Sequence, residues 1–320
     1  MSPLFGKKKK PSSILVLDIE SGSVGSGLVV LSEEKPRLLG QERKSLFSRG
    51  KPSASKLLED IEKETEHSLA RLSHVAANMR AHGAPTDVSR VAIFLHAPWA
   101  GVSILPERAK ADAHDETLDR LRAAAGGVLS NAPISFHSFS TTTTPIVHGV
   151  YNAPEETLVC TIGSEVAEVS FLKRGSIMGH ATVPTGLNTL LRTLESHAGI
   201  SRAEALSILS LSRSSREHVW AEALAAGMSH LAHELSLGAG ELLSPARTSQ
   251  QVFVVAPRGS ADFFARSFTE DAGMHELFAP GSTIRAVSSR ALVPHLASHP
   301  AQPDIPLLLE SLFVDTRFGI

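Results

Sequence analysis

The sequence contains a single cysteine, Cys160, in 320 residues. A disulfide bond within the chain is therefore excluded, which is consistent with a reducing cytosol. No run of about 18 apolar residues occurs, so the sequence predicts no membrane-spanning helix. The formal net charge is only −2, and no overall positive field favours nucleic acid as a partner. No repeat with a period of about 20–50 residues is visible, so we do not expect a repeat architecture.

Residues 1–12 form a basic segment, which we interpret as a flexible leader. A secretory signal peptide would continue with about 7–15 apolar residues, but Asp18 and Glu20 interrupt the apolar run that begins at Ile14. We therefore predict that this run is a buried strand. The leader either solubilises the chain or contacts anionic lipid, at about 1 kcal/mol per charge near a membrane surface. The lysines concerned are Lys7, Lys8, Lys9 and Lys10.

Hydrophobic residues make up 42% of the chain, enough for one large domain or two medium ones. Short β-branched runs predict two similar β-hairpins, over 13–31 and 158–172, which indicates two related halves. Apolar residues at helical spacing predict several helices. We expect these helices over 54–81, 115–125, 187–197, 201–209 and 217–237, the last one ending at Gly238. This mixture of strands and helices is typical of an α/β fold.

Shorter segments connect these elements. Apolar runs predict further strands, at 91–95, 101–105, 134–139 and 252–255. We interpret the threonine run 141–144 as a β-rich linker between the halves. Ser201 and Glu204, three residues apart, match the capping box of a helix N-terminus. The apolar tail over 305–313 is predicted to pack on the core as a last helix or strand.

Three motifs separate this chain from a generic α/β protein. The first hairpin reads LDIESGSV from Leu17 to Val24, and the second reads CTIGSEVAEV from Cys160 to Val169. A later strand and turn read VFVVAPRGS from Val252 to Ser260. These motifs resemble the actin, heat-shock chaperone and sugar-kinase superfamily, whose members carry an Asp-x-Gly-Ser/Thr hairpin in each half and a Gly-Gly turn after a later strand. The resemblance implies a two-lobed, actin-like ATPase fold.

Within this superfamily the chain most resembles the type IV pilus assembly protein PilM and the cell-division protein FtsA. It shares an LFGKK start from Leu4 to Lys8, a VPTGLN turn from Val183 to Asn188 and a GISRAEA helix start from Gly199 to Ala205. The resemblance implies a small insert subdomain of the FtsA/PilM type. The implied division is 13–85 for the first lobe core, 86–140 for the small insert subdomain, 141–290 for the second lobe with its helical subdomain, and 291–320 for the return to the first lobe.

The resemblance also implies a site for ATP with magnesium between the hairpins. A tight turn of glycine and serine presents N–H groups and hydroxyls to phosphate oxygens, and glycine lets the backbone approach closely. Asp18 is the implied magnesium ligand, since the aspartate of such hairpins holds the ion through water. The implied nucleotide contacts are Asp18, Ser21, Gly22, Ser23, Thr161, Gly163, Ser164, Gly259 and Ser260.

Several residues depart from the superfamily pattern. Glu20 and Glu165 replace glycines of the two turns, and Thr161 replaces the second aspartate. Gly25 takes the place of a basic residue, and Ala256 begins the turn where Gly-Gly is usual. A like charge about 4 Å from a phosphate costs about 4 kcal/mol at an effective dielectric near 20. We therefore predict that ATP binds weakly or not at all, and we assign no catalytic residue.

The resemblance implies a cytoplasmic scaffold, peripheral at the inner face of the membrane, that links a membrane-associated assembly of pilus or division type. Its implied partner is a short segment of a membrane-associated protein, and head-to-tail contacts would join copies into filaments. The alternatives are a nucleotide-dependent actin-like filament, and an ATPase or small-molecule kinase of the same superfamily. His230, His233 and Glu234 share one predicted helix face, but a metal site needs more donors at fixed spacing.

Overall fold

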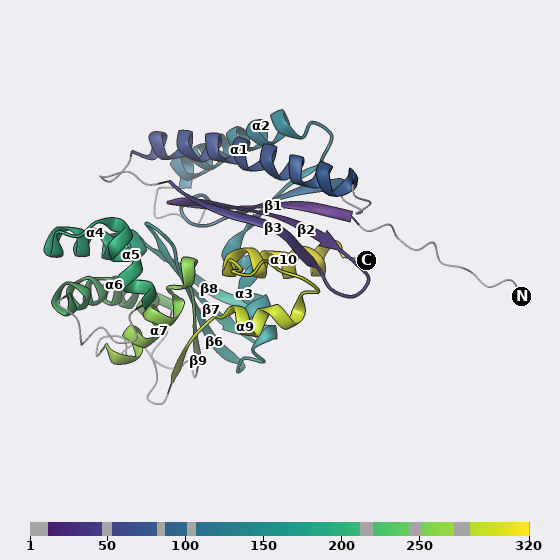
Figure 1. Ribbon diagram of the computed structural model, residues 1–320. Helices are drawn as coiled ribbons and strands as arrows, with labels where there is room; N and C mark the ends of the chain where they lie inside the picture. Colours follow the sequence, from purple (N-terminus) through teal and green to yellow (C-terminus); the bar gives the residue numbers. More distant parts are fainter. Residues whose placement is uncertain are drawn as a thin grey trace, which may run out of the picture.

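The computed structural model describes residues 12–46, 53–81, 87–100, 107–211, 220–242, 251–271 and 282–319. It has two lobes, each built on a mixed five-stranded sheet with helices packed against it (Figure 1). This arrangement confirms the predicted two-lobed α/β fold. The leader lysines and the strand predicted at 101–105 lie outside the described residues. No helix in the described part of the chain is long and apolar enough to cross a membrane.

The first lobe is built on a sheet with the strand order β3-β2-β1-β4-β5. Its strands are β1 (Ser12–Glu20), β2 (Ser23–Leu31), β3 (Arg37–Ser45), β4 (Val88–Leu95) and β5 (Ile134–Ser138). The first three run antiparallel, whereas β4 and β5 run parallel to β1. The central strand β1 is buried on both faces, and its middle, residues 14–17, is a continuous apolar run. Its outer face is covered by α1 (Ala54–Ala81) and α2 (Glu107–Val128).

The second lobe is built on a sheet with the order β10-β9-β6-β7-β8. Its strands are β6 (Glu156–Ile162), β7 (Ala167–Lys173), β8 (Ser176–Val183), β9 (Gln251–Val255) and β10 (Thr283–Ala286). The helices of this lobe are α4 (Leu187–Ala198), α5 (Arg202–Leu211), α6 (Ala221–Leu242) and α7 (Ala261–Glu270). The described residues also contain three short helical segments, namely η2 (Pro257–Gly259), α9 (Ser289–Leu292) and η3 (Val293–His295).

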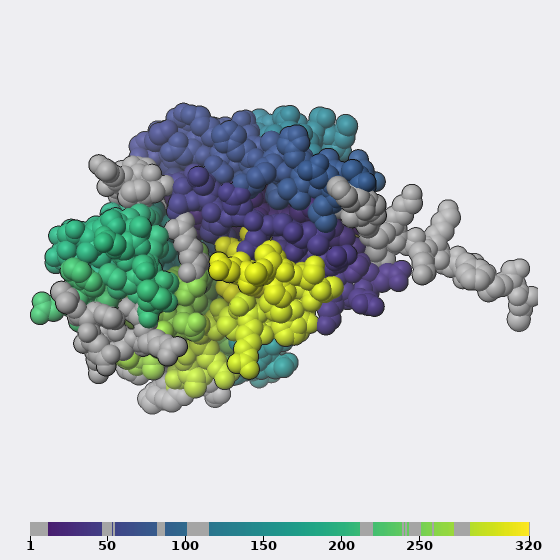
Figure 2. Space-filling model, viewed as in Figure 1, coloured from purple at the N-terminus to yellow at the C-terminus, as the bar shows by residue number. Residues whose placement is uncertain are grey.

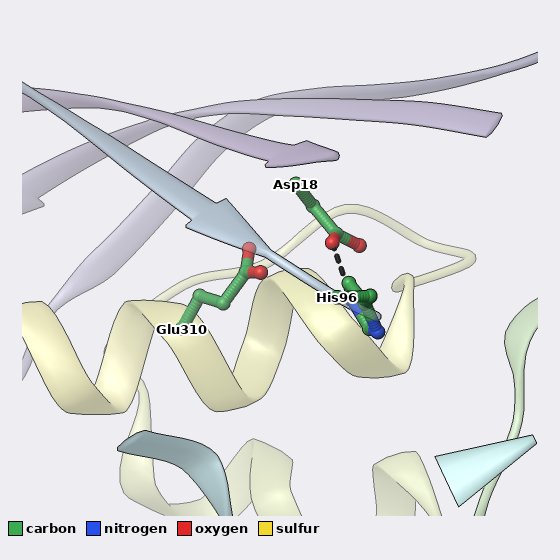
Figure 3. A group of neighbouring side chains, drawn as sticks. All are labelled: Asp18, His96 and Glu310. Carbon is green, nitrogen blue, oxygen red and sulfur yellow. Dashed lines mark ion pairs between the residues drawn. The ribbon is translucent and has the colours of Figure 1, made fainter. Parts of the chain in front are cut away.

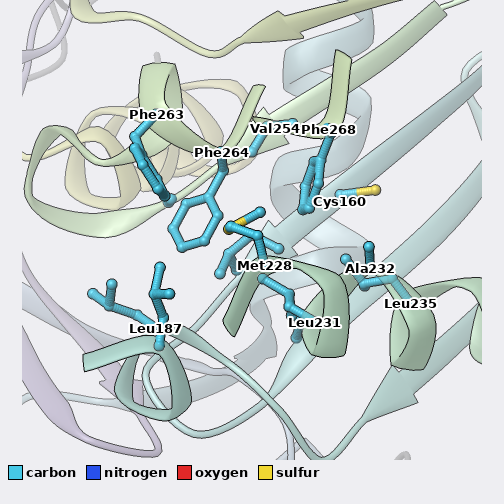
Figure 4. Close-up of a cluster of buried hydrophobic side chains, with 14 of the residues drawn as sticks. Cys160, Leu187, Met228, Leu231, Ala232, Leu235, Val254, Phe263, Phe264 and Phe268 are labelled. Atoms are coloured by element: carbon cyan, nitrogen blue, oxygen red, sulfur yellow. The ribbon is translucent and has the colours of Figure 1, made fainter. Parts of the chain in front are cut away.

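Three apolar cores hold these layers together. One lies beneath α1 and α2, and a second lies between the second sheet and its helices, where Phe264 and Phe268 are buried (Figure 4). The third joins the lobes and contains Phe94 of the first sheet and Phe253 of the second. Its helices are α3 (Phe139–Val150) and α10 (Ile305–Phe318). Since fully burying one such side chain contributes roughly 1.5–3 kcal/mol, this central core fixes the lobes against each other.

The structure decides one open prediction, whether the tail is a helix or a strand, and confirms one predicted helix start. The apolar tail forms the helix α10, and the carboxylate of Asp304 caps it by accepting a hydrogen bond from the N–H of Leu307 at 3.3 Å. The capping box is confirmed at the start of α5. The N–H of Ser201 donates to the Glu204 carboxylate at 2.7 Å, and the N–H of Glu204 donates to the Ser201 hydroxyl at 3.3 Å.

Two local predictions are wrong. The threonine run lies in α3 and not in a β-rich linker, because the hydroxyls of Thr142 and Thr143 donate to carbonyls of the preceding turn at 2.8 and 2.7 Å. Helix α6 does not end at Gly238 but continues to Leu242. A Cβ at Gly238 would lie 2.6 Å from Cγ1 of Val183, so this glycine permits close packing against β8.

The segment 86–140 also differs from its predicted role as a small insert subdomain. Its described strands, β4 and β5, pair with β1 and with each other in the first sheet. The connecting helix α2 packs beside α1 on the same face. The apolar strands of this segment are therefore part of the core of the first lobe rather than a separate unit. The other predicted boundaries stay predictions.

Candidate functional site between the two hairpins

The turns of the two hairpins lie in direct contact between the lobes. The N–H of Ser164 donates a hydrogen bond to Oε1 of Glu20, and the Ser164 hydroxyl donates to Oε2 at 3.1 Å. The N–H of Glu165 donates to the hydroxyl of Ser21 at 3.0 Å. Residues that are 144 positions apart in the chain thus form one site, as the actin-like fold predicts.

Glu20 is the central residue of this contact. Its side chain is only 3% exposed, and its carboxylate also accepts a hydrogen bond from the Ser23 hydroxyl at 2.5 Å. A Cβ at Gly163 would lie 2.9 Å from Oε1 of Glu20, so the glycine leaves room for the carboxylate. The N–H and hydroxyl groups of such a turn are the donors that a phosphate group would use. Here they bind a carboxylate of the protein itself.

The two turns are also packed closely. A Cβ at Gly22 would lie 2.6 Å from the Cβ of Ser164, which is too close for any side chain. The second turn is held from behind by the start of α4. The N–H groups of Leu187 and Asn188 donate to the carbonyl oxygens of Gly163 and Ser164 at 2.9 and 2.7 Å. These bonds satisfy helix N–H groups that have no partner within α4, and they fix the second turn in place.

Asp18, the predicted magnesium ligand, is fully buried and pairs with Arg43 of β3. Asp18 lies opposite Gly25 in the β1–β2 pairing, and Gly25 lies opposite Arg43 in the β2–β3 pairing. A Cβ at Gly25 would lie 2.8 Å from a guanidinium nitrogen of Arg43. The glycine thus opens a path across β2, and the basic group missing at position 25 is supplied by the next strand.

The guanidinium of Arg43 contacts several groups at once. It binds Asp304 through two hydrogen bonds, from Nε at 2.6 Å and from Nη2 at 2.8 Å. Its Nη1 donates to the Ser23 hydroxyl at 2.9 Å and lies 3.9 Å from Oε2 of Glu20. Such two-pronged pairing is the strong form of an arginine–carboxylate contact. Arg43 therefore ties the first hairpin to the capping residue of α10.

His96 continues the network toward the second lobe. It follows β4, and its Nε2 lies 2.6 Å from Oδ1 of Asp18. Its ring stacks on Phe139 of α3, with the centroids 3.9 Å apart. Its Nδ1 lies 3.8 Å from Oε2 of Glu168 in β7, and Glu168 pairs with His180 of β8 at 3.2 Å. A chain of ionisable groups thus crosses from one lobe to the other.

Glu310 approaches Asp18 and His96 from α10 (Figure 3). Its side chain is fully buried, and neither carboxylate oxygen has a hydrogen-bond partner among the described residues. One oxygen of Glu310, one oxygen of Asp18 and one nitrogen of His96 lie within 4.8 Å of one another. Two carboxylates and an imidazole therefore share one buried space.

Burial and mutual charge shift the pKa of these groups in different directions. Burial alone would raise the pKa of Asp18, but His96 and Arg43 outweigh it and hold this pKa well below its usual value. Burial alone would lower the pKa of His96, but the charge of Asp18 outweighs it and raises this pKa. Burial and the charge of Asp18 together raise the pKa of Glu310 well above its usual value. Glu310 thus requires either a proton or a cation beside it.

Glu165, the second acidic replacement, is turned away from the hairpin contact. Its carboxylate pairs with Arg192 of α4 at 2.8 Å and accepts a hydrogen bond from the side-chain amide of Asn188 at 2.7 Å. The amide oxygen of Asn188 accepts in turn from Arg202 of α5. The charge of Glu165 is therefore compensated within the second lobe, where it anchors the turn to α4.

The turn after β9 lies at a neighbouring cleft. Gly259, with a φ of +73°, lines a cavity of about 610 Å³ together with Arg43, Asp304 and Ser288. Only glycine adopts such a φ without strain. The hydroxyl of Ser260 points back into its own turn and donates to the carbonyl oxygen of Pro257 at 2.7 Å.

The structure brings most of the predicted contact residues together. The residues gathered at the hairpins are Asp18, Ser21, Gly22, Ser23, Gly163 and Ser164. Thr161 is buried in β6 opposite Glu168, and Gly259 and Ser260 belong to the turn beside the cleft. Their role toward a nucleotide stays a prediction.

Sequence reasoning missed the residues that complete the network, which are Arg43, His96, Glu168, His180, Asp304 and Glu310. A signal existed for Arg43, because the three-strand register places it beside Gly25 and Asp18. No local signal existed for the other five, since they lie on β7, on β8, after β4 and in α10 with its capping residue, far apart in the sequence from Asp18.

The hairpin arrangement does not fit magnesium-bound ATP. Glu20 already binds the N–H of Ser164 that would hold a phosphate, and Arg43 already binds Oδ2 of Asp18. The contact between Gly22 and Ser164 leaves no space between the turns. A triphosphate would have to displace these groups and separate the lobes.

No protein-family model matches the sequence, and no curated protein matches it either. Among the solved structures that resemble this chain, two align along 98% of it. The ethanolamine utilization protein EutJ from Carboxydothermus hydrogenoformans aligns at a TM-score of 0.60 and 16% identity, over 98% of this chain and 92% of that chain. A PilM–PilN type IV pilus biogenesis complex aligns at a TM-score of 0.56 and 13% identity, over 98% of this chain and 97% of that chain. Taken with its paired hairpins, this similarity shows that the chain has the two-lobed, actin-like fold.

Proposed function

We propose that this chain is an actin-like scaffold that binds a partner protein, and that its own side chains fill the inter-lobe site so that ATP binds weakly or not at all. The observation that carries the proposal is the Glu20 carboxylate bound by the N–H and hydroxyl of Ser164. Glu20 supplies the negative charge that a phosphate would bring. Arg43 supplies, beside Asp18, positive charge of the kind that Mg²⁺ would bring.

The energy of these contacts opposes nucleotide binding. Each hydrogen bond to a charged group contributes about 1.5–3 kcal/mol, and ATP has to break those that Glu20 makes before it can occupy the turns. The displaced carboxylate then repels the phosphates from close range. Every 1.4 kcal/mol of such cost weakens binding about tenfold. Two displaced contacts are therefore enough to move a micromolar affinity toward the millimolar range.

The proposed partner is a protein. One of the solved structures that share this fold is a complex of PilM with PilN. We propose that the present chain likewise binds a short segment of a membrane-associated protein, in an assembly of pilus or division type, at the cytoplasmic face of a membrane. Contact of the leader lysines with anionic lipid, and head-to-tail filaments, are further parts of this proposal.

The nucleotide part of the proposal is tested by thermal unfolding with and without Mg-ATP at about 1 mM. The melting temperature of the parent chain is expected to shift by less than about 1 °C, because a ligand far below its Kd contributes almost nothing to stability. Glu20→Gly frees the donors of Ser164, and Mg-ATP is then expected to raise its melting temperature by a few degrees. Glu165→Gln is the matched control, since it removes a neighbouring carboxylate that faces α4 instead of the turns.

Two results would contradict this account. A micromolar Kd of the parent for Mg-ATP, measured by calorimetry, would show that Glu20 leaves the turns readily and would favour the nucleotide-dependent filament. A Glu20→Gly variant that binds Mg-ATP no better than the parent would show that Glu20 is not what excludes the nucleotide.

The proposal of a membrane-associated protein partner is tested by sedimenting the full chain together with membranes from the cells that produce it. Binding is expected to be lost when the exposed membrane proteins are first removed by protease. Protein-free vesicles of anionic lipid provide the comparison, and replacing the four leader lysines by glutamine separates the lipid contribution. Equal binding to protease-treated membranes and to protein-free vesicles would contradict a protein partner and would indicate that the chain contacts lipid only.

A further inference from the structure

We infer that Asp18, His96 and Glu310 form a buried binding site for one divalent transition-metal ion, such as Zn²⁺ or Mn²⁺, held by side chains of the first lobe without any nucleotide. The three residues come from three separate elements, namely β1, the residue after β4, and α10. Figure 3 shows their side chains converging. Their ligand atoms lie within 4.8 Å of one another.

The strongest support is the carboxylate of Glu310. Its side chain is fully buried, and neither of its oxygens has a hydrogen-bond partner among the described residues. A buried carboxylate in this position has to hold a proton or be compensated by an ion pair or a metal. The side chain lies directly beside Asp18 and His96, so a cation between the three groups would satisfy it.

The neighbouring cation does not remove this requirement. Arg43 binds Oδ2 of Asp18 and both oxygens of Asp304, so its charge is already shared by two carboxylates. Oδ1 of Asp18, in contrast, faces His96 and makes no hydrogen bond of ordinary geometry to a described residue. A metal at this oxygen would take the place of the proton between Asp18 and His96, while the other oxygen of Asp18 holds Arg43.

The donor set indicates the class of ion. Two carboxylates and one imidazole suit Zn²⁺, Mn²⁺ or Fe²⁺ better than Ca²⁺, which prefers oxygen ligands alone. With ligand bonds of about 2.1 Å, donor atoms lie at most about 4.2 Å apart, so small side-chain rotations would close the site. The remaining ring nitrogen of His96, Nδ1, lies 3.8 Å from Glu168. A carboxylate behind a histidine is the usual arrangement that orients a metal-binding imidazole.

The ion would act as a structural link beneath the first hairpin. It would join β1, β4 and α10, of which β1 and β4 already pair as parallel strands and α10 packs on them in the apolar core between the lobes. All three ligands are buried, so the ion would enter during folding or while the lobes are apart. This site does not involve the Glu20–Ser164 contact, and its failure would leave the proposed scaffold function untouched.

The test measures metal content of the full chain, made without an affinity tag in medium supplemented with Zn²⁺ or Mn²⁺. After gel filtration in metal-free buffer, elemental analysis is expected to find about one ion per chain, and EDTA with mild denaturant is expected to lower the melting temperature. Glu310→Gln is expected to retain at least about tenfold less metal. The control His230→Gln/His233→Gln removes the two exposed histidines of α6 and is expected to retain the ion.

A readout without variants covers the case in which Glu310→Gln does not fold. Co²⁺ loaded into the unaltered chain is expected to give visible absorption bands of a protein-bound ion that disappear on adding excess Zn²⁺. A parent chain that holds less than about a tenth of an ion and shows no such bands would overturn the proposal. So would equal retention by Glu310→Gln, or loss of the metal from the α6 control, which would assign it to surface histidines.

Discussion

The two halves of the molecule share a strand order but differ in what their hairpins carry. Read from the hairpin edge, the first sheet runs β3-β2-β1-β4-β5 and the second runs β8-β7-β6-β9-β10, with the same pattern of parallel and antiparallel pairs. The first turn presents the Glu20 carboxylate, whereas the second presents the N–H and hydroxyl of Ser164. One half thus carries the anion and the other carries the groups that bind it.

The buried acids differ between the halves as well. In the first hairpin the acid is Asp18 on β1, opposite Gly25, and in the second it is Glu168 on β7, opposite Thr161. The buried acid thus lies on the first strand of one hairpin and on the second strand of the other. His96 lies between these two acids and contacts both. The two halves therefore share a backbone arrangement but not the positions of their buried acids, because each acid is paired with different neighbouring side chains.

The largest loss of unfolding free energy is expected from replacing Arg43, the arginine that pairs with Asp18 and Asp304. Arg43→Met leaves Asp18 and Asp304 buried without their partner, and breaking a buried ion pair from one side costs about 3–5 kcal/mol. Urea unfolding measures the loss. Arg80→Met, which removes an arginine from an exposed pair with Asp87, is the control and is expected to cost less than about 1 kcal/mol. Equal losses in the two variants would show that Arg43 has no special role.

An intermediate loss of stability is expected when a side chain is added between the two hairpin turns. Gly22→Ala places a Cβ 2.6 Å from the Cβ of Ser164, and overpacking of this kind costs about 1–3 kcal/mol. Because the strain falls on the contact between the halves, the N–H of Ser164 is expected to exchange its hydrogen faster, as measured by NMR. The matched control is Gly126→Ala in α2, where nothing lies within 4 Å of the added Cβ. That variant gains up to about 1 kcal/mol of helix propensity, and a similar gain from Gly22→Ala would refute the close contact.

The smallest effect on stability is expected from Glu165, the acidic residue of the second turn. Burial of Glu165 alone would raise its pKa, but Arg192 and Asn188 outweigh it and lower the pKa. Since the folded pKa is the lower one, the stabilisation by Glu165 is fully present above its unfolded pKa, near 4.3. It is lost as the pH falls through the folded pKa. The pair is partly exposed, so the effect is less than about 1 kcal/mol.

In Glu165→Gln the free energy of unfolding is expected to fall less steeply than in the parent as the pH is lowered from about 5 to about 3. Chemical unfolding of the parent and the variant across this range measures the difference. An unchanged slope would show that Glu165 does not contribute, and would weaken the contrast between its compensated charge and the inward-facing charge of Glu20.

Much of the fold was predictable from the sequence because it depends on local pattern. The long helix over 54–81 and both hairpins follow from apolar periodicity, and the structure contains all of them. The capping box at Ser201 follows from two residues three positions apart. The threonine run was misjudged because β propensity is a weak preference, and hydrogen bonds of the hydroxyls to the previous turn allow these residues in α3.

The sequence by itself determined the two hairpins, several of the other strands, most of the helices, and the unusual residues Glu20, Thr161 and Glu165 of the hairpins. The tertiary structure alone decided where the charges of those residues go. Glu20 is inserted into the second turn while Glu165 is paired with α4, and Arg43, His96 and Glu310 converge on Asp18 from three other elements. The physical reason is range: backbone pattern acts over a few residues, whereas a buried charge is compensated by whichever group the folded chain brings within a few ångströms.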